Sequence, residues 1–224
     1  MELLVGTGGW DYFPATAGDR LKAYSKAFNF VEVNSTFYSL PRIATVRSWR
    51  RRVPADFVFS VKCNGLATHV HGLKPIDETF RVLRAMNMVC KLLRSDMLVI
   101  QTSSRVEINE EKIREISKTM SIVKDENVDV FWEARAIADS KKNPELQTEM
   151  LENGIYPIID LSRTNPPRDA DQIYSRLFSP GALEYSDEVI KHIGKKVKGS
   201  KAKRIVLSFH GVNMYKDAAK YLEK

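Results

Sequence analysis

The chain has 224 residues, of which 43% are hydrophobic, so it can bury the core of one large domain and is not a disordered chain. The formal net charge of +7 favours an anionic partner, either a small molecule or nucleic acid. Two cysteines exclude a disulfide framework. Without a leader pattern or an apolar run long enough to span a bilayer, the sequence predicts a cytoplasmic protein with no membrane partner.

Eight short apolar runs are predicted to be strands, and helical patterns lie between them. The runs span residues 3–6, 30–34, 57–63, 97–101, 128–133, 156–161, 173–177 and 204–209. Between the third and fourth runs, Val82, Met86, Val89 and Leu93 fall on one stripe at helical spacing. The chain therefore alternates strand and helix along its whole length.

This alternation, with no linker and no break in composition, predicts a single α/β domain over residues 1–224. Eight strands favour a closed (β/α)8 barrel of the TIM type, and an open doubly wound sheet is the structural alternative. Because the chain is short for such a barrel, we expect trimmed connections. Residues 162–172 include Pro166 and Pro167 and show little helical periodicity, so the helix after the sixth strand is expected to be short or missing.

The predicted strands have one apolar face and another face that becomes polar towards the C-terminal end. In the second run, Val31 and Val33 point one way while Glu32 and Asn34 point the other, because side chains alternate across a strand. The other runs end similarly. A parallel barrel gathers such residues at its C-terminal face, where barrel enzymes place their active sites.

Several segments together resemble the DUF72 family, whose members are also called YecE-like proteins. They read GTGGWDY at 6–12, VEVNSTFYSLP at 31–41, FVFSVK at 57–62 and WEAR at 132–135, with Trp49, Pro54, Thr68 and His69 in the family's order. The resemblance implies a TIM-barrel-like fold and no established activity. Two later segments depart from the family pattern. Arg176-Leu177-Phe178-Ser179 stands where the family has arginine–x–histidine–glycine, and Phe209-His210-Gly211 stands where it has phenylalanine–asparagine–asparagine.

Four side chains at predicted strand ends are candidates for catalysis: Glu133, Glu32, Lys62 and Asp160. A glutamate whose pKa is raised by desolvation can act as a general acid or base. Lys62 can bind an anion as a point charge, or form a Schiff base if burial lowers its pKa. The alternative is that these charges neutralise one another in a buried network without a ligand.

Eight further residues are candidates for binding a substrate. Arg135 and Arg176 can hold a phosphate or carboxylate in a bidentate manner. Aromatic faces and amide groups that could orient the rest of the molecule come from Trp10, Tyr12, Asn34, Tyr38, Asn64 and Gln101.

The glycine-rich segment after the first strand, residues 6–10, either exposes N–H groups to an anion or forms a tight turn that places Trp10. It matches neither a P-loop nor a dinucleotide fingerprint, so the sequence identifies no cofactor. Three histidines, His69, His71 and His210, could contribute to a nitrogen–oxygen metal site together with an acid. No compact ligand motif joins them, and we predict no metal.

The sequence thus predicts a TIM-barrel protein that binds an anionic, phosphate-like or nucleotide-like ligand at its C-terminal strand ends. Hydrolysis with a carboxylate as acid or base is the reaction class that these residues favour. The alternative is a non-catalytic nucleic-acid-binding protein that uses its basic surface, and a third hypothesis is a metabolite-binding or scaffold protein.

Overall fold

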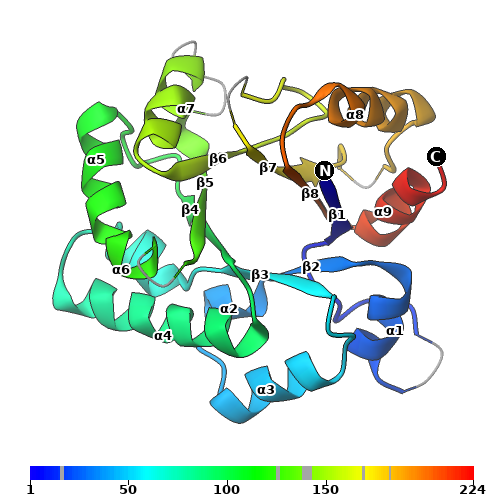
Figure 1. The fold of residues 1–224 in the computed structure, drawn as a ribbon, viewed down its shortest axis with the longest axis horizontal. Coiled ribbons are helices and arrows are strands. Elements are labelled where there is room, and N and C mark those ends of the chain that lie inside the picture. Colours follow the sequence, from blue (N-terminus) through cyan, green and yellow to red (C-terminus); the bar gives the residue numbers. More distant parts are fainter. Residues whose placement is uncertain (16–17, 125–126, 138–142, 168–169, 182) are drawn as a thin grey trace. The chain divides into compact units, whose positions relative to one another are not determined.

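The computed structural model describes residues 1–15, 18–124, 127–137, 143–167, 170–181 and 183–224. Its parallel strands follow one another in the order β1 to β8 as a closed barrel, which confirms the predicted (β/α)8 fold (Figure 1). The strands are β1 (Glu2–Thr7), β2 (Phe30–Val33), β3 (Val58–Lys62), β4 (Met97–Thr102), β5 (Asp129–Ala134), β6 (Ile155–Ile159), β7 (Gln172–Phe178) and β8 (Arg204–His210).

By its internal contacts the chain divides into two compact units, which are described separately below. Unit 1 comprises Met1–Glu32, Arg51–Val58 and Ile158–Lys224, and unit 2 comprises Val33–Arg50 and Phe59–Pro157. The organisation as one domain over residues 1–224 stays a prediction.

In unit 1, β1 pairs with β8 along its whole length, and β8 pairs with β7. The helices of this unit are α1 (Arg20–Ala27), α8 (Asp187–Gly199) and α9 (Met214–Leu222). Figure 1 shows α9 beside β1 and β8. Between β6 and β7 the described residues form turns and extended chain without a helix, as the two prolines there predicted.

In unit 2, β4 and β5 pair in register from Met97 to Thr102. The helical segments are α2 (Ser35–Tyr38), α3 (Ile43–Arg51), the π-helical turn η1 (Leu66–Val70), α4 (Asp77–Leu93), α5 (Glu110–Thr119), α6 (Ser121–Lys124), the 3-10 turn η2 (Arg135–Ile137) and α7 (Asn143–Glu152). Figure 1 shows α4, α5 and α6 as neighbours in this unit.

The core of unit 2 follows the predicted stripes. Val82, Met86, Val89 and Leu93 on α4 are all buried, and every residue of β4 is buried as well. The two cysteines are buried and free, as expected for small core residues, and burial raises the pKa of the Cys63 thiol to about 12. Burial of such side chains stabilises the fold by about 1.5–3 kcal/mol for each large aliphatic group.

One glycine in β1 is required by close packing in unit 1. A Cβ on Gly6 would lie 1.9 Å from the carbonyl oxygen of Phe30, so no other residue fits without moving β2. The buried hydroxyl of Tyr24 bridges the same strands. It donates to the Phe30 carbonyl and accepts from the Thr7 N–H, each at 2.8 Å. The first glycine of the glycine-rich segment is therefore a packing residue.

One expectation about local structure is corrected. Asn34 does not continue the second strand, because β2 ends at Val33 and Asn34 has helical backbone angles (φ −84°, ψ −23°) before α2. His69 belongs to the turn η1.

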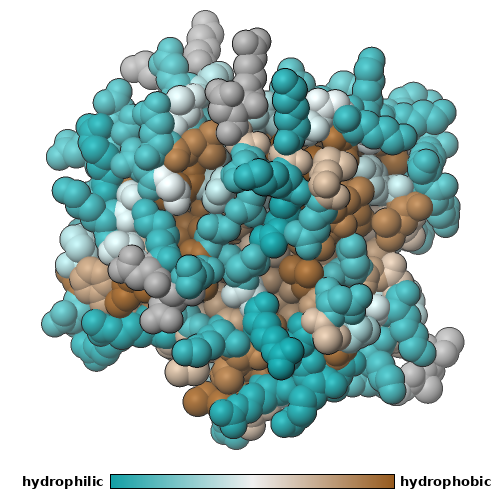
Figure 2. All heavy atoms as spheres, viewed as in Figure 1, coloured by the Kyte–Doolittle hydropathy of each residue, from teal (hydrophilic) through white to brown (hydrophobic). Residues whose placement is uncertain are grey.

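Hydrophilic side chains cover most of the face shown in Figure 2, with apolar patches between them. Across the described part of the chain, the helices lack the length and apolar character that a bilayer crossing needs.

Candidate functional site

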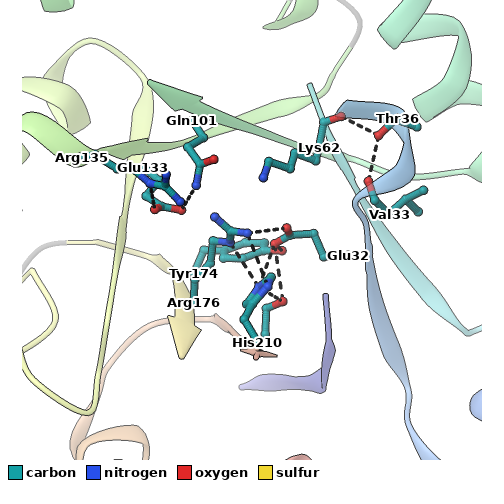
Figure 3. A network of polar contacts seen from close by, with 11 residues as sticks. Glu32, Val33, Thr36, Lys62, Gln101, Glu133, Arg135, Tyr174, Arg176 and His210 are labelled. Carbon is teal, nitrogen blue, oxygen red and sulfur yellow. Dashed lines mark hydrogen bonds and ion pairs between the residues drawn. The ribbon is translucent and has the colours of Figure 1, made fainter. Parts of the chain in front are cut away.

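A cross-strand pair in unit 2 joins two of the predicted site residues. Gln101 on β4 and Glu133 on β5 are register partners, so their side chains emerge side by side on the same face. The Gln101 amide donates a 2.8 Å hydrogen bond to the Glu133 carboxylate. Gln101 is buried, and it therefore fixes the position of the carboxylate (Figure 3).

Arg135 binds the other oxygen of the same carboxylate. It lies in η2, directly after β5, and its Nε donates to Glu133 at 3.0 Å. The Arg135 side chain is 49% exposed. Since a guanidinium has five N–H donors and this bond uses one, Arg135 can donate to a further anionic group in solvent.

Lys62 ends β3 in the same unit, and its ammonium lies over an aromatic face. The distance from Nζ to the centroid of the Phe37 ring is 4.6 Å, which is a cation–π contact. The backbone here is fixed by Thr36, whose hydroxyl lies 2.6 Å from the Lys62 carbonyl oxygen (Figure 3). Asn64, a predicted binding residue, uses its amide to hold this backbone, since it donates to the Thr36 carbonyl at 2.8 Å.

The pKa of His69 depends on the charged side chains near it. Its ring lies edge-on to Phe37 with centroids 5.0 Å apart, and its Nδ1 lies 2.9 Å from the Thr68 hydroxyl. Burial lowers the pKa of His69, and the charges of Lys62 and Arg135 lower that pKa further. The positive charges of Lys62 and Arg135 thus disfavour protonation of His69.

Contacts join Phe37 to Lys62 and His69, and join Glu133 to Gln101 and Arg135. The charges of Lys62 and Arg135 both act on His69. We call these unit 2 residues together the Lys62 cluster: Phe37, Lys62, His69, Gln101, Glu133 and Arg135. It contains two cationic side chains and one carboxylate. Such a cluster retains positive charge and can attract an anion.

A second group of polar side chains lies in unit 1 around Glu32, which is fully buried on β2. The hydroxyl of Tyr174 donates to the Glu32 carboxylate at 2.8 Å, and Nη2 of Arg176 lies 3.1 Å from it. Tyr174 and Arg176 are two residues apart on β7, so they share one face of that strand (Figure 3).

Two residues of β8 complete this second group, Ser208 and His210. Nε2 of His210 accepts from Nε of Arg176 at 3.2 Å and lies 2.9 Å from the Ser208 hydroxyl. An acceptor Nε2 places the ring proton of a neutral imidazole on Nδ1. The His210 ring stacks on Phe178 with centroids 4.8 Å apart. We call Glu32, Tyr174, Arg176, Ser208 and His210 the Glu32 cluster.

The Glu32 cluster is buried, and its acid and arginine neutralise each other. A buried charge needs a partner, and Arg176 supplies one to Glu32 Oε1 while Tyr174 donates a hydrogen bond to Oε2. The prediction that Glu32 and Arg176 act on a ligand stays a prediction, and the contacts of this cluster are also those of the alternative, a mutually neutralising network.

Asp160 lies in a tight turn after β6 in unit 1. Its Oδ1 accepts from the backbone N–H and from the hydroxyl of Ser162, at 2.9 and 2.6 Å. Burial raises the pKa of Asp160, and the bonds from Ser162 oppose this shift. Lys196 supports the same turn through bonds to the carbonyls of Leu161 and Thr164, each at 2.8 Å. These contacts give Asp160 a turn-forming role.

The predicted aromatic residues differ in their surroundings. Trp10 is buried, whereas Tyr12 and Tyr38 are exposed. The Gly8 N–H in the glycine-rich segment donates to the Phe209 carbonyl at 2.9 Å, and Gly9 has φ +130°. This segment has the contacts of a tight turn that places Trp10.

Three residues in these contacts were not among the predicted site residues. Tyr174 and Ser208 lie two positions before Arg176 and His210 on their strands, so strand alternation could have identified both. Phe37 precedes the predicted Tyr38, and its role under Lys62 has no signal in the sequence, because it depends on the turn of α2.

Within the described residues, no three His, Cys, Asp or Glu side chains are grouped so that they could hold a metal ion. Nε2 of His210 lies 3.6 Å from the Glu32 carboxylate, to which Tyr174 also donates.

Comparisons with known proteins agree with the fold. The model of DUF72, a family of proteins of unknown function, matches residues 4–223. The UPF0759 protein YunF of Bacillus subtilis is 33% identical over 82 residues, a match that covers 34% of this chain and 29% of YunF. The chain therefore aligns with less than a third of that relative's length.

Solved structures are similar over nearly the whole chain. A DUF72 family protein from Enterococcus faecalis has a TM-score of 0.77 at 16% identity, covering 99% of this chain and 96% of that one. A D-tagatose 3-epimerase-like protein has a TM-score of 0.59 at 15% identity, covering 100% and 97%. At these identities the likeness shows the fold alone. The match over residues 4–223 shows that the chain belongs to the DUF72 family.

Proposed function

We propose that the chain binds an anionic small molecule, with a phosphate or carboxylate group, at the Lys62 cluster. The observation that supports this most is the geometry of Arg135, whose side chain is 49% exposed while its Nε donates to Glu133. Burial lowers the pKa of His69, and the charges of Lys62 and Arg135 lower that pKa further. In this proposal one anion is bound by both cations. A bound anion would relieve their mutual repulsion.

The two cations would bind this anion in different ways. Lys62 is a point charge supported by the face of Phe37. Arg135 is oriented by its Nε bond to Glu133 and would present its remaining N–H groups to one or two oxygens. Gln101 holds Glu133 and so keeps Arg135 in this orientation.

The reaction that we propose at this site is hydrolysis, with Glu133 as the general base. Its carboxylate would take a proton from a water molecule whose oxygen attacks the phosphorus or acyl carbon. The bond to the leaving group then breaks, and the leaving group takes up the proton. Removal of a general base typically slows such a step by about 10²- to 10⁴-fold.

The experiment that tests the binding proposal is a titration with inorganic phosphate, followed by thermal unfolding and calorimetry. Ligand at 100 times its Kd stabilises a protein by about 2.7 kcal/mol. Lys62→Met and Arg135→Ala should each weaken binding. The matched controls Lys91→Met and Arg84→Ala, at exposed positions on α4, should bind like the wild type.

Equal weakening by the control and cluster variants would show that net charge alone attracts the anion. That result would instead support the nucleic-acid-binding alternative. For that function, affinity for a polynucleotide would fall steeply with salt and survive Glu133→Gln. For hydrolysis, Glu133→Gln should slow turnover of a phosphomonoester by about 10²- to 10⁴-fold, a loss much larger than the change in phosphate affinity that follows from its altered bond to Arg135.

A further inference from the structure

The edge of the Lys62 cluster carries an exposed tyrosine whose side chain packs little against the fold. Tyr38, the last residue of α2, is 83% exposed. Its ring meets Phe37 edge-on, with centroids 5.1 Å apart and planes at 86°. An exposed tyrosine ring presents a large apolar face together with a polar hydroxyl, and both can contact a ligand.

The Phe37 ring joins this tyrosine to the charged part of the cluster. Lys62 Nζ and the His69 ring lie 4.6 and 5.0 Å from the Phe37 centroid, and Tyr38 lies at a similar distance. Turn η1, which carries His69, is held against α2 by the bond from Asn64 to Thr36. A cation and two exposed rings therefore surround one half-buried ring.

We infer that the Lys62 cluster takes a nucleoside phosphate, with the phosphate on Lys62 and Arg135 and the base against the rings of Tyr38 and His69. The inference rests on the proposed function, because it extends the anion site towards Tyr38. One ribose separates phosphate from base, and this matches a site in which charge and exposed rings are both neighbours of Phe37.

The chemistry of the rings favours a base over a bare phosphate or sugar. Bases stack on aromatic faces without regard to their sequence, and each stacked base strengthens binding by roughly 5- to 150-fold. Burial lowers the pKa of His69, and the charges of Lys62 and Arg135 lower it further, so the protonated form of this ring is disfavoured. Inorganic phosphate has no base that could contact Tyr38, so this ring would not strengthen its binding.

The test compares the Kd of adenosine monophosphate, ribose 5-phosphate and inorganic phosphate on wild type, Tyr38→Ala, Tyr38→Phe and the control Met88→Ala. Met88 is an exposed apolar residue on α4 of the same unit. We expect adenosine monophosphate to bind tightest by roughly 5- to 150-fold. Tyr38→Ala should remove that advantage, and Tyr38→Phe and Met88→Ala should retain it.

Each other outcome is decisive. If the three ligands bind equally and Tyr38→Ala changes none of them, the base has no site and the inference is overturned while the anion site stands. If none binds, the proposed function itself fails. If only a polynucleotide binds, with a steep salt dependence, the inference is overturned in favour of a nucleic-acid partner.

Discussion

The hydroxyl of Tyr174 donates a 2.8 Å hydrogen bond to the carboxylate of Glu32 across 142 residues of sequence. Arg176, two residues further along β7, lies 3.1 Å from the same carboxylate. Glu32 is fully buried and Arg176 nearly so. Strands β2 and β7, from opposite ends of the sequence, are thus tied together in the interior of unit 1.

Replacing Glu32 by Gln should destabilise the protein strongly, because Arg176 would keep its charge without its buried partner. Removal of one member of a buried ion pair typically costs about 3–5 kcal/mol. Urea unfolding of wild type and variant measures this difference. The control is Glu2→Gln, which breaks an exposed pair with Arg204 and should cost at most about 1 kcal/mol. Equal losses in both variants would contradict the structural role of the Glu32 cluster.

Lys62→Met should raise the pKa of His69 towards its ordinary value of 6.5. Burial is the first cause of the lowered pKa and remains in the variant, so the recovery is partial. An NMR titration of the His69 ring measures this change, with Lys91→Met as control. An unchanged His69 pKa in Lys62→Met would show that the ammonium does not act at this ring.

The same histidine gives a pH dependence with a defined sign. Because the folded protein holds the His69 pKa below 6.5, the unfolded chain binds the proton more tightly. The stability contributed by neutral His69 is therefore present above pH 6.5 and is lost as the pH falls through the folded pKa. His69→Gln should flatten this part of a stability profile measured by urea unfolding. A profile with the same slope in the variant would contradict the assignment.

Asp217 on α9 should give a dependence of the opposite sign. Burial raises the pKa of its carboxyl above 3.8, and its Oδ1 accepts from the Tyr185 N–H at 2.8 Å. The stability from this group is present below pH 3.8 and is lost as the pH rises through the folded pKa. Asp217→Asn keeps an acceptor for Tyr185, so the stability of this variant should increase relative to that of the wild type as the pH rises above 4. A relative increase in the stability of the wild type would contradict this.

Gly6→Ala should prevent normal folding, because the new Cβ would lie 1.9 Å from the Phe30 carbonyl oxygen. The control is Gly194→Ala on α8, where nothing lies within 4 Å of the added Cβ. Alanine within a helix is favoured over glycine by about 0.5–1 kcal/mol, so this variant should be more stable. Soluble yield and thermal unfolding measure both effects, and a well-folded Gly6→Ala protein would contradict the packing of β1 against β2.

Part of the site could be predicted from sequence, because strand alternation and strand order determine which side chains lie next to each other. Gln101 and Glu133 sit at matching positions near the ends of consecutive strands, and parallel register makes them neighbours. Arg135 lies two residues after Glu133 in the sequence. The fold was predictable for a similar reason, since eight alternating units have few compact arrangements.

Other features could not be read from sequence, because they depend on which distant side chains meet. Arg176 resembles an anion-binding residue until its contact with Glu32 is known. Phe178 and His210 each lie in one of the two segments that depart from the family pattern. They are register partners that stack on each other, and only the β7–β8 pairing shows this. The contact of Phe37 with Lys62 likewise requires the turn after Val33.

The measurement that tests the anion site most directly is an NMR titration of the His69 ring with inorganic phosphate. A phosphate held between Lys62 and Arg135 should shift the His69 resonances to saturation and raise the His69 pKa, because it offsets the two positive charges. The shift should disappear in Lys62→Met and persist in Lys91→Met. Resonances that never saturate, or that saturate equally in both variants, would contradict the account.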